Sequence, residues 1–204
     1  MIVYVESNFV LELALDQEEA ASARNILQFV SDGAIELEFP AFALSEPFWT
    51  IRLRGKKRLQ LSNSINEQFK QLRRSQSYKK TVSKFQPLPI VLAEIEGKEY
   101  TSLGSTVEHL LQVGKPIEMD LAVFRRAFRY EKRYGLSPQD SIVYSSVIGS
   151  LQHQNPSEVK CFANRNWKDF RDPGIISELK SYNCQYEETF KDALSFIKRN
   201  LPSK

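Results

Sequence analysis

Short apolar runs alternate with longer stretches of helical spacing along the whole chain. Residues 2–5 form a continuous apolar run, which predicts a strand buried on both faces. Apolar or alternating runs predict three more strands, at residues 35–39, 159–163 and 184–186. Because helical patterns separate these strands, we expect an α/β fold with a central parallel sheet and helices on both of its faces.

Helical spacing of apolar residues accounts for most of the remaining chain. The first helix is expected to end at Asp32 and Gly33. Ser137 and Pro138 mark the start of a later helix, as its cap and its first-turn residue. Pro47 is compatible with a helix only in the first turn. After this first helix, the predicted helices cover residues 43–53, 56–84, 90–113, 120–134, 138–151, 173–182 and 190–201. An interruption is expected near residues 97–104 and a polar loop at residues 164–172.

The predicted helix at residues 120–134 has two distinct faces. Leu121, Phe124 and Phe128 are expected to point into the core. The basic residues of this helix are expected to face outward and to offer a second surface to a polyanion. They are Arg125, Arg126, Arg129, Lys132 and Arg133.

The length of 204 residues suits one domain, residues 1–204, with a substantial core. No apolar run approaches the roughly 20 residues of a membrane span, and the N-terminus carries no leader pattern. We therefore expect a cytoplasmic protein with no membrane partner. Cys161 and Cys184 lie in apolar, strand-like contexts and are expected to be buried free thiols.

The net charge is only +3, but the basic residues are concentrated in one segment. Residues 52–80 contain ten lysines and arginines and a single acid, Glu67. Such a segment on an otherwise acidic chain is typical of a nucleic-acid contact, although a solvated helical arm is the alternative. The residues expected to bind the polyanion are Arg52, Arg54, Lys56, Lys57, Arg58, Arg73 and Arg74.

Four carboxylates stand where predicted strands end or where a predicted helix begins. Parallel strands end at the same edge of a sheet, so these acids are expected to converge on one electronegative pocket. Like charges at close range repel each other, and a hard divalent cation relieves that repulsion. The pattern predicts a metal-dependent enzyme acting on phosphates. Its catalytic and metal-binding residues are Glu6, Glu46, Asp140 and Asp169, and its supporting polar residues are Asn8 and Asn166.

Each acid also has a simpler explanation. Glu46 could cap its helix, and Asp140 could be an ordinary first-turn acid. Asp169 could pair with a neighbouring cation such as Arg165 in a solvated loop. Glu6 is the hardest to explain in this way, because an acid that ends a buried strand is costly unless it is paired or bound to metal.

Four short segments, in this order along the chain, resemble segments of the PIN-domain nucleases. Their sequences are YVESN at residues 4–8, PAFALSE at 40–46, LSPQDSIV at 136–143 and CFANRNWKDF at 161–170. The resemblance implies a three-layer α/β/α sandwich and metal-dependent cleavage of RNA, usually single-stranded, with Mg²⁺ or Mn²⁺ as the cofactor. The positions that match the family's four acids are Glu6, Glu46, Asp140 and Asp169. Residues 54–119 lie outside the detailed resemblance and predict a basic helical insertion.

The chain departs from the PIN family at two positions. The first acid is usually Asp, and the longer Glu6 displaces the carboxylate by about one carbon–carbon bond, which Mg²⁺ tolerates less well than Mn²⁺. Asn166 stands where the family often has an acid or an amide. Both departures favour an alternative function, a catalytically weak PIN-like module that binds RNA or a protein.

The resemblance leaves the biological role open between a toxin held by an antitoxin protein and a stand-alone RNA-processing enzyme. It also leaves open whether the chain forms a homodimer. A phosphatase-like or receiver-like protein uses strand-end acids as well, but the sequence has no Gly-rich phosphate loop. Trp167, beside Asn166, is expected to pack against the fold rather than to stack on a nucleobase.

Overall fold

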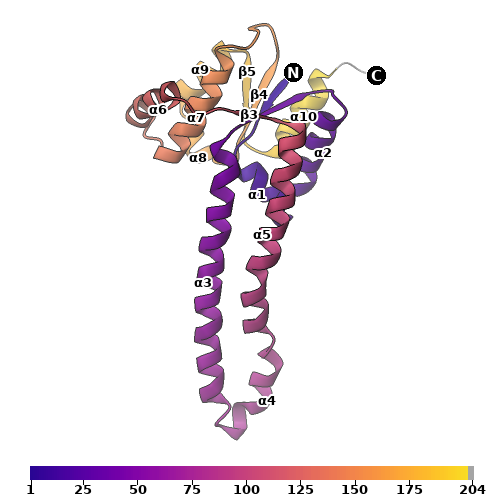
Figure 1. The fold of residues 1–204 in the computed structure, drawn as a ribbon, viewed down its shortest axis with the longest axis vertical. Helices are drawn as coiled ribbons and strands as arrows, with labels where there is room; N and C mark the ends of the chain where they lie inside the picture. The colour runs from indigo at the N-terminus through magenta and orange to yellow at the C-terminus, as the bar shows by residue number, and fades with distance from the viewer. Residues whose placement is uncertain (202–204) are drawn as a thin grey trace.

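The computed structural model describes residues 1–201, which contain a five-stranded sheet whose strands are all parallel (Figure 1). In spatial order the strands are β3, β2, β1, β4 and β5. Their bounds are β1 Ile2–Tyr4, β2 Glu36–Pro40, β3 Lys115–Ile117, β4 Lys160–Ala163 and β5 Cys184–Glu187. The α/β class and the parallel sheet that the sequence predicts are confirmed.

β3 is the strand that the sequence pattern did not predict. Its three residues, Lys115, Pro116 and Ile117, are too few and too polar to give an alternating pattern. β3 lies at an edge of the sheet and pairs with β2. A proline is tolerated there because no further strand needs its missing N–H.

Helices make up most of the remaining described chain, and several begin or end close to the predicted positions. α7 begins as predicted, with Ser137 as its cap and Pro138 in its first turn. The helices are α1 Ser7–Leu15, α2 Ala20–Ser31, α3 Phe42–Leu72, α4 Gln76–Phe85, α5 Leu88–Val113, α6 Leu121–Tyr134, α7 Pro138–Leu151, α8 Trp167–Phe170, α9 Pro173–Ser181 and α10 Phe190–Asn200.

Helices cover both faces of the sheet, because successive side chains of each strand point to opposite sides. Val3, Leu37 and Cys161 point to one face, where they belong to a buried cluster with residues of α1, α2 and α10. Tyr4 and Phe162 point to the other face, in a cluster with residues of α7 and α9. This arrangement is compatible with a three-layer sandwich.

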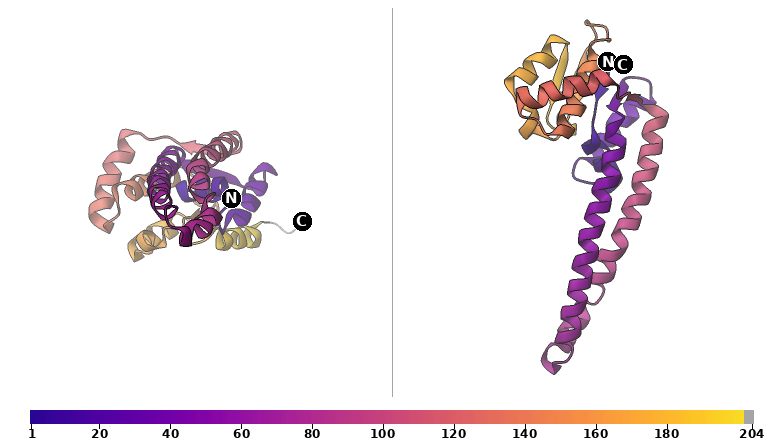
Figure 2. Two further views of the ribbon diagram at one scale, coloured as in Figure 1. Left: turned by 90° about the horizontal axis from the view of Figure 1, so that it is seen from below. Right: turned by 60° about the vertical axis from the view of Figure 1, so that its left-hand side comes forward.

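α3 and α5 form a long antiparallel hairpin that projects from the sheet, with α4 at its far end (Figures 1 and 2). Ile51, Gly55 and Ser62 of α3 are buried. The Ser62 hydroxyl donates a hydrogen bond to the Pro89 carbonyl oxygen of α5, 2.7 Å away. A Cβ on Gly55 would meet the Glu96 side chain, so the absence of a side chain lets α5 approach closely.

The hairpin corrects three predictions. α3 is one continuous helix through the break expected between residues 53 and 56, and Pro47 lies in its second turn rather than its first. α5 runs without interruption through Gly97 and Gly104. The packing of the two helices along each other explains the continuity. Tertiary contacts outweigh the roughly 1 kcal/mol by which a glycine destabilises a helix relative to alanine.

α6 exposes the apolar stripe that was predicted to be buried. Leu121, Phe124 and Phe128 have 74%, 39% and 66% of their surface exposed. The helix is buried instead through Val123 and Ala127, on the side that packs against α7. Both stripes have helical spacing, so the periodicity of the sequence could not show which one meets the neighbouring helix.

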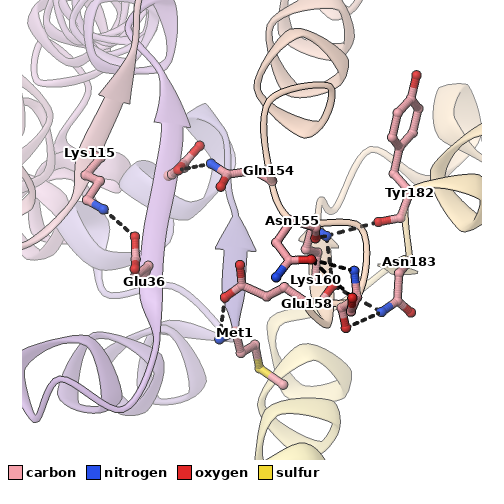
Figure 3. Close-up of polar contacts among 11 residues, drawn as sticks. Met1, Glu36, Lys115, Gln154, Asn155, Glu158, Lys160, Tyr182 and Asn183 are labelled. Carbon is pink, nitrogen blue, oxygen red and sulfur yellow. Dashed lines mark hydrogen bonds and ion pairs between the residues drawn. The ribbon is translucent and has the colours of Figure 1, made fainter.

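The amino-terminal edge of the sheet is held together by polar contacts (Figure 3). The α-amino group of Met1 lies 2.9 Å from a carboxylate oxygen of Glu158. Lys160 is buried, and its ammonium group donates to the backbone carbonyl oxygens of Asn155, Glu158 and Tyr182 at 2.7, 2.8 and 3.2 Å. These contacts join the beginnings of β1, β4 and β5.

The structure bears on the two cysteines and on the expected absence of a membrane span. Cys161 and Cys184 are buried free thiols, as predicted. Burial raises the pKa of the Cys184 thiol to about 12, which leaves it protonated and unreactive at neutral pH. Within residues 1–201, no helix is long and apolar enough to cross a membrane.

Candidate active site

The strand order of the sheet reverses between β1 and β4. From β1 the chain continues to β2 and β3 on one side, whereas β4 and β5 lie on the other side. In open parallel sheets, ligands bind outside the carboxyl ends of the strands at this reversal point. Glu6 follows β1 by two residues and Asn166 follows β4 by three, so both stand beside the expected crevice.

A cavity of about 300 Å³ brings together side chains from four separate segments of the chain. Three of the four predicted acids and both supporting amides contribute to its lining. The lining residues are Glu6, Ser7, Asn8, Glu46, Gln139, Asp140, Val143 and Asn166. A larger cavity of about 520 Å³, formed by α1, α2 and α5, has no carboxylate in its lining.

Ser7 connects two of the acids in the cavity. Its hydroxyl oxygen lies 2.6 Å from Glu6 Oε2 and 2.6 Å from Glu46 Oε2. A hydroxyl has one proton to donate, so it can satisfy only one of the two carboxylates at a time. The other short contact is favourable only when one carboxyl group carries a proton or when a cation neutralises the pair.

Glu6 is the most strongly perturbed acid of the cavity. It is only 6% exposed, and burial raises the pKa of its carboxyl group from 4.5 to about 7. The hydrogen bonds from Ser7 and from the Asn8 backbone lower this pKa, and the nearby charges of Glu46 and Asp140 raise it. Glu6 Oε1 is buried and has no hydrogen-bond partner within the described part of the chain. A buried oxygen of this kind is destabilising unless something supplies the missing contact.

Asp140 stands at the start of α7 and makes contacts to both sides. The Asn166 side-chain amide donates a hydrogen bond to Asp140 Oδ1, 3.0 Å away. The Asp140 backbone N–H donates to the Ser137 hydroxyl at 3.1 Å, which completes the cap of the helix. Asp140 is therefore a first-turn acid and a residue of the cavity at the same time.

Glu46 does not cap its helix. α3 begins at Phe42 and has no acidic residue in its first turn, so Glu46 lies one turn further along. Its side chain is half-buried in the cavity lining, with Oε2 2.6 Å from the Ser7 hydroxyl oxygen. The simple explanation by the helix dipole therefore does not account for its position.

Asp169 is the predicted acid that the structure does not bring into the cavity. The segment 164–172 was expected to be a loop, but it contains α8, and Asp169 is exposed on this short helix. Arg165, one of its expected partners, pairs instead with the buried Glu12 and lies 3.6 Å from Glu18. The described cavity thus has three acids rather than four.

Sequence reasoning did not assign a role to Ser7 or to Gln139, although both line the cavity. Each is the immediate neighbour of a predicted acid. Ser7 opens α1 directly after Glu6, and Gln139 precedes Asp140 in the first turn of α7. Adjacency to an acid at a helix start is the only signal that could have indicated them.

The basic residues predicted to bind RNA lie on the hairpin and just beyond the end of α3. Arg58 forms an ion pair within the hairpin, because its guanidinium lies 2.6 Å from the Glu99 carboxylate of α5. The other six are exposed to solvent: Arg52, Arg54, Lys56, Lys57, Arg73 and Arg74. On α6, Arg126 was expected to face outward, but it donates hydrogen bonds to Ser145 and Gln152.

The lining of the cavity matches the preferences of a hard divalent cation. The atoms of the lining that could act as metal ligands are carboxylate, hydroxyl and amide oxygens, which Mg²⁺ and Mn²⁺ prefer. The unpartnered oxygen of Glu6 offers a ligand whose burial is otherwise uncompensated. Within residues 1–201, however, no group of three or more His, Cys, Asp or Glu side chains lies close enough together to hold a metal ion as it stands. The oxygen ligands of the cavity suit such an ion by their chemistry, and its carboxylates are those of Glu6, Glu46 and Asp140.

Comparison with known proteins gave no relative for this chain: no family model, no curated protein and no solved structure matches it.

Proposed function

We propose that the chain is a divalent-metal-dependent endoribonuclease of the PIN type, with the acidic cavity as its active site. One observation supports this most strongly. Glu6, Glu46 and Asp140, which are far apart in sequence, line one cavity at the point where the strand order reverses. The unpartnered oxygen of Glu6 and the serine shared by two carboxylates are features that a cation would stabilise. The exposed basic residues of the α3–α5 hairpin support the proposal that residues 54–119 are a basic helical insertion.

The cavity residues divide into those that would hold a cation and those that position them. A Mg²⁺ or Mn²⁺ ion, when bound, neutralises charge at the phosphate and lowers the pKa of water for its attack. Glu6, Glu46 and Asp140 would hold this ion. Ser7 fixes the first two relative to each other, and Asn166 fixes Asp140. The lining contains no histidine, so the proton of the attacking water passes to a carboxylate or to solvent.

The substrate backbone would approach the cavity along α3. Arg52, Arg54, Lys56 and Lys57 are exposed within the three turns that follow Glu46. Contacts of this kind give affinity that does not depend on base sequence and that falls steeply with salt concentration. The Asn8 amide, which also lines the cavity, would be available to bind a phosphate oxygen.

A second function has specific support, namely that of a PIN-like module that binds RNA without efficient cleavage. The three acids are not already grouped as a metal site in the described residues. Burial also raises the pKa of Glu6 to about 7, so a proton competes with a cation for this carboxyl group near neutral pH. Both features weaken the affinity of the empty cavity for a cation.

Cleavage of a labelled single-stranded RNA tests the proposal. The purified chain would be incubated with Mn²⁺ or Mg²⁺, beside Asp140→Asn and a sample with EDTA. Asp169→Asn is the matched control, because Asp169 is an acid outside the cavity. We expect the wild type and Asp169→Asn to cleave, and Asp140→Asn to lose about 100-fold in rate or more.

Two results would refute the nuclease. Equal cleavage by the wild type and Asp140→Asn would attribute the activity to a contaminant. Salt-sensitive RNA binding by the wild type with no cleavage under any metal would establish the binding module instead.

A further inference from the structure

Both tryptophans of this chain are exposed, and both are near neighbours in sequence of residues that line the acidic cavity. Trp49 and Trp167 are the only two in the sequence, and 60% and 43% of their surface is exposed. Trp49 follows the cavity residue Glu46 by three positions on α3, and Trp167 directly follows Asn166 at the start of α8. Aromatic side chains of this size normally bury most of their surface. The expectation that Trp167 packs against the fold is met only in part.

The helical position of Trp49 makes it a surface neighbour of the cavity residue Glu46. Residues three apart on an α-helix are surface neighbours, with their Cβ atoms about 5–6 Å apart. Side chains on a helix also lean toward its N-terminus, over the preceding turn. For Trp49, the preceding turn is the one that carries Glu46. From this geometry we expect the indole to lean over the turn that carries Glu46 rather than further out on the hairpin.

Both indoles stand among cations. Arg52 is one turn beyond Trp49, with Lys56 one turn further, and both are exposed. Around Trp167, the Lys168 ammonium lies 5.8 Å from the ring centroid, and the Arg171 guanidinium, which is also paired with the Glu188 carboxylate, lies 4.7 Å from it. An aromatic surface surrounded by positive charge is how proteins bind single-stranded nucleic acids, with bases on the rings and phosphates on the cations.

We propose that Trp49 and Trp167 form a stacking subsite for unpaired nucleobases that flank the phosphodiester held at the acidic cavity. This inference rests on the proposed function and assigns the residues that would contact the bases of a single strand. Bases in a duplex are already stacked and paired, so they cannot lie on these rings. Stacking accepts every base, because each has an aromatic face. The subsite therefore selects for strandedness and not for sequence.

The test compares two ligands that differ only in their bases. Binding of a labelled oligouridylate and of an abasic oligonucleotide of equal length and charge would be measured in EDTA, where no cleavage occurs. The variants are Trp49→Ala, Trp167→Ala and the conservative Trp49→Phe. Leu61→Ala is the matched control, because Leu61 is an apolar residue of α3, 52% exposed, 12 positions beyond Trp49.

We expect each alanine variant to bind the oligouridylate about tenfold more weakly and the abasic ligand unchanged. Trp49→Phe should retain most of the affinity, and Leu61→Ala should match the wild type. Binding should also quench the fluorescence of the remaining tryptophan in each single-tryptophan variant.

A wild type that binds both ligands equally would overturn the subsite, as would tryptophan variants that lose affinity for both or for neither. Cleavage that depends on Asp140 would still support the nuclease in that case. The converse result, base-dependent binding by the tryptophans without any cleavage, would refute the nuclease and leave the nucleobase subsite standing.

Discussion

Glu6 combines three features that are individually destabilising. Its carboxyl group is almost completely buried, one of its oxygens has no partner among residues 1–201, and the other shares the single hydroxyl proton of Ser7 with Glu46. Strained or unsatisfied groups of this kind concentrate at functional sites, where a ligand completes them. The metal-free cavity should therefore reveal its acids through the dependence of stability on pH.

Glu6→Gln tests this dependence. Folding raises the pKa of Glu6 from 4.5 to about 7, so the folded chain holds this proton more tightly than the unfolded chain. The resulting stabilisation is fully present below pH 4.5 and is lost as the pH rises through about 7. In EDTA, the free energy of unfolding of the wild type relative to Glu6→Gln should fall by up to about 3 kcal/mol over this range.

Urea unfolding of both proteins at pH 4.5 and pH 8 measures the effect. The comparison with the variant removes the contributions of all other titrating groups. A difference between the two proteins that is the same at both pH values would contradict the raised pKa.

Three of the acids that line the cavity could be predicted from the sequence, but the contacts that they make could not. Glu6, Glu46 and Asp140 could be predicted because each follows a strand or opens a helix near the same sheet edge. Asp169 could not be placed, because a one-turn helix was not foreseen and the direction of a side chain depends on that helix. The role of Ser7 depends on a distance between two remote segments, which no local pattern encodes.

The α3–α5 hairpin depends on contacts between its two helices, since neither helix can bury much surface alone. Arg58 and Glu99 are 2.6 Å apart, and their side chains are 25% and 18% exposed. Removing one partner leaves the other charge partly desolvated, so Arg58→Ala should weaken local stability of the hairpin by about 1–2 kcal/mol. Amide hydrogen exchange in α3 and α5 measures this directly.

Arg54→Ala is the matched control for this prediction, because Arg54 is an exposed arginine one turn away on the same helix. It should leave amide protection in the hairpin unchanged. Equal losses of protection in both variants would show that the Arg58–Glu99 pair does not stabilise the hairpin.

For helices and strands, the sequence predicted whether a segment is a helix or a strand better than it predicted where a helix is interrupted or which of its sides is buried. Four strands and the start of α7 followed from apolar runs and capping residues. The continuity of α5 through Gly97 and Gly104 could not be predicted from such local patterns, because it results from packing against α3. The buried side of α6 could not be predicted either, since both apolar stripes of this helix repeat at helical spacing.

The α3–α5 hairpin forms a long arm of the molecule (Figures 1 and 2), and the acidic cavity includes Glu46, near the start of α3 where the arm leaves the sheet. Arg73, at the end of α3, is 27 residues beyond Glu46, and at about 1.5 Å per helical residue this separation is about 40 Å. A short RNA in the cavity cannot reach the tip, whereas a long one can. The arm should therefore make affinity depend on RNA length.

Substitution of both Arg73 and Arg74 by alanine tests this length dependence. The double variant should bind an RNA of about 30 nucleotides more weakly, with a salt slope smaller by about 1.4 for two lost phosphate contacts. Its affinity for a pentanucleotide should not change. Lys198→Ala with Arg199→Ala, at the exposed end of α10, is the control and should affect neither ligand. Equal weakening for both RNA lengths would contradict the role of the tip.

Measurement of Mn²⁺ binding by electron paramagnetic resonance tests most directly whether Glu6, Glu46 and Asp140 form one divalent-cation site, as we propose. The wild type should bind Mn²⁺ more tightly at pH 8 than at pH 6, because the cation competes with the Glu6 proton. Asp140→Asn and Glu6→Gln should each weaken binding by about tenfold or more, and Asp169→Asn should bind like the wild type. Binding that is absent from the wild type, or equal in all four proteins, would contradict the claim.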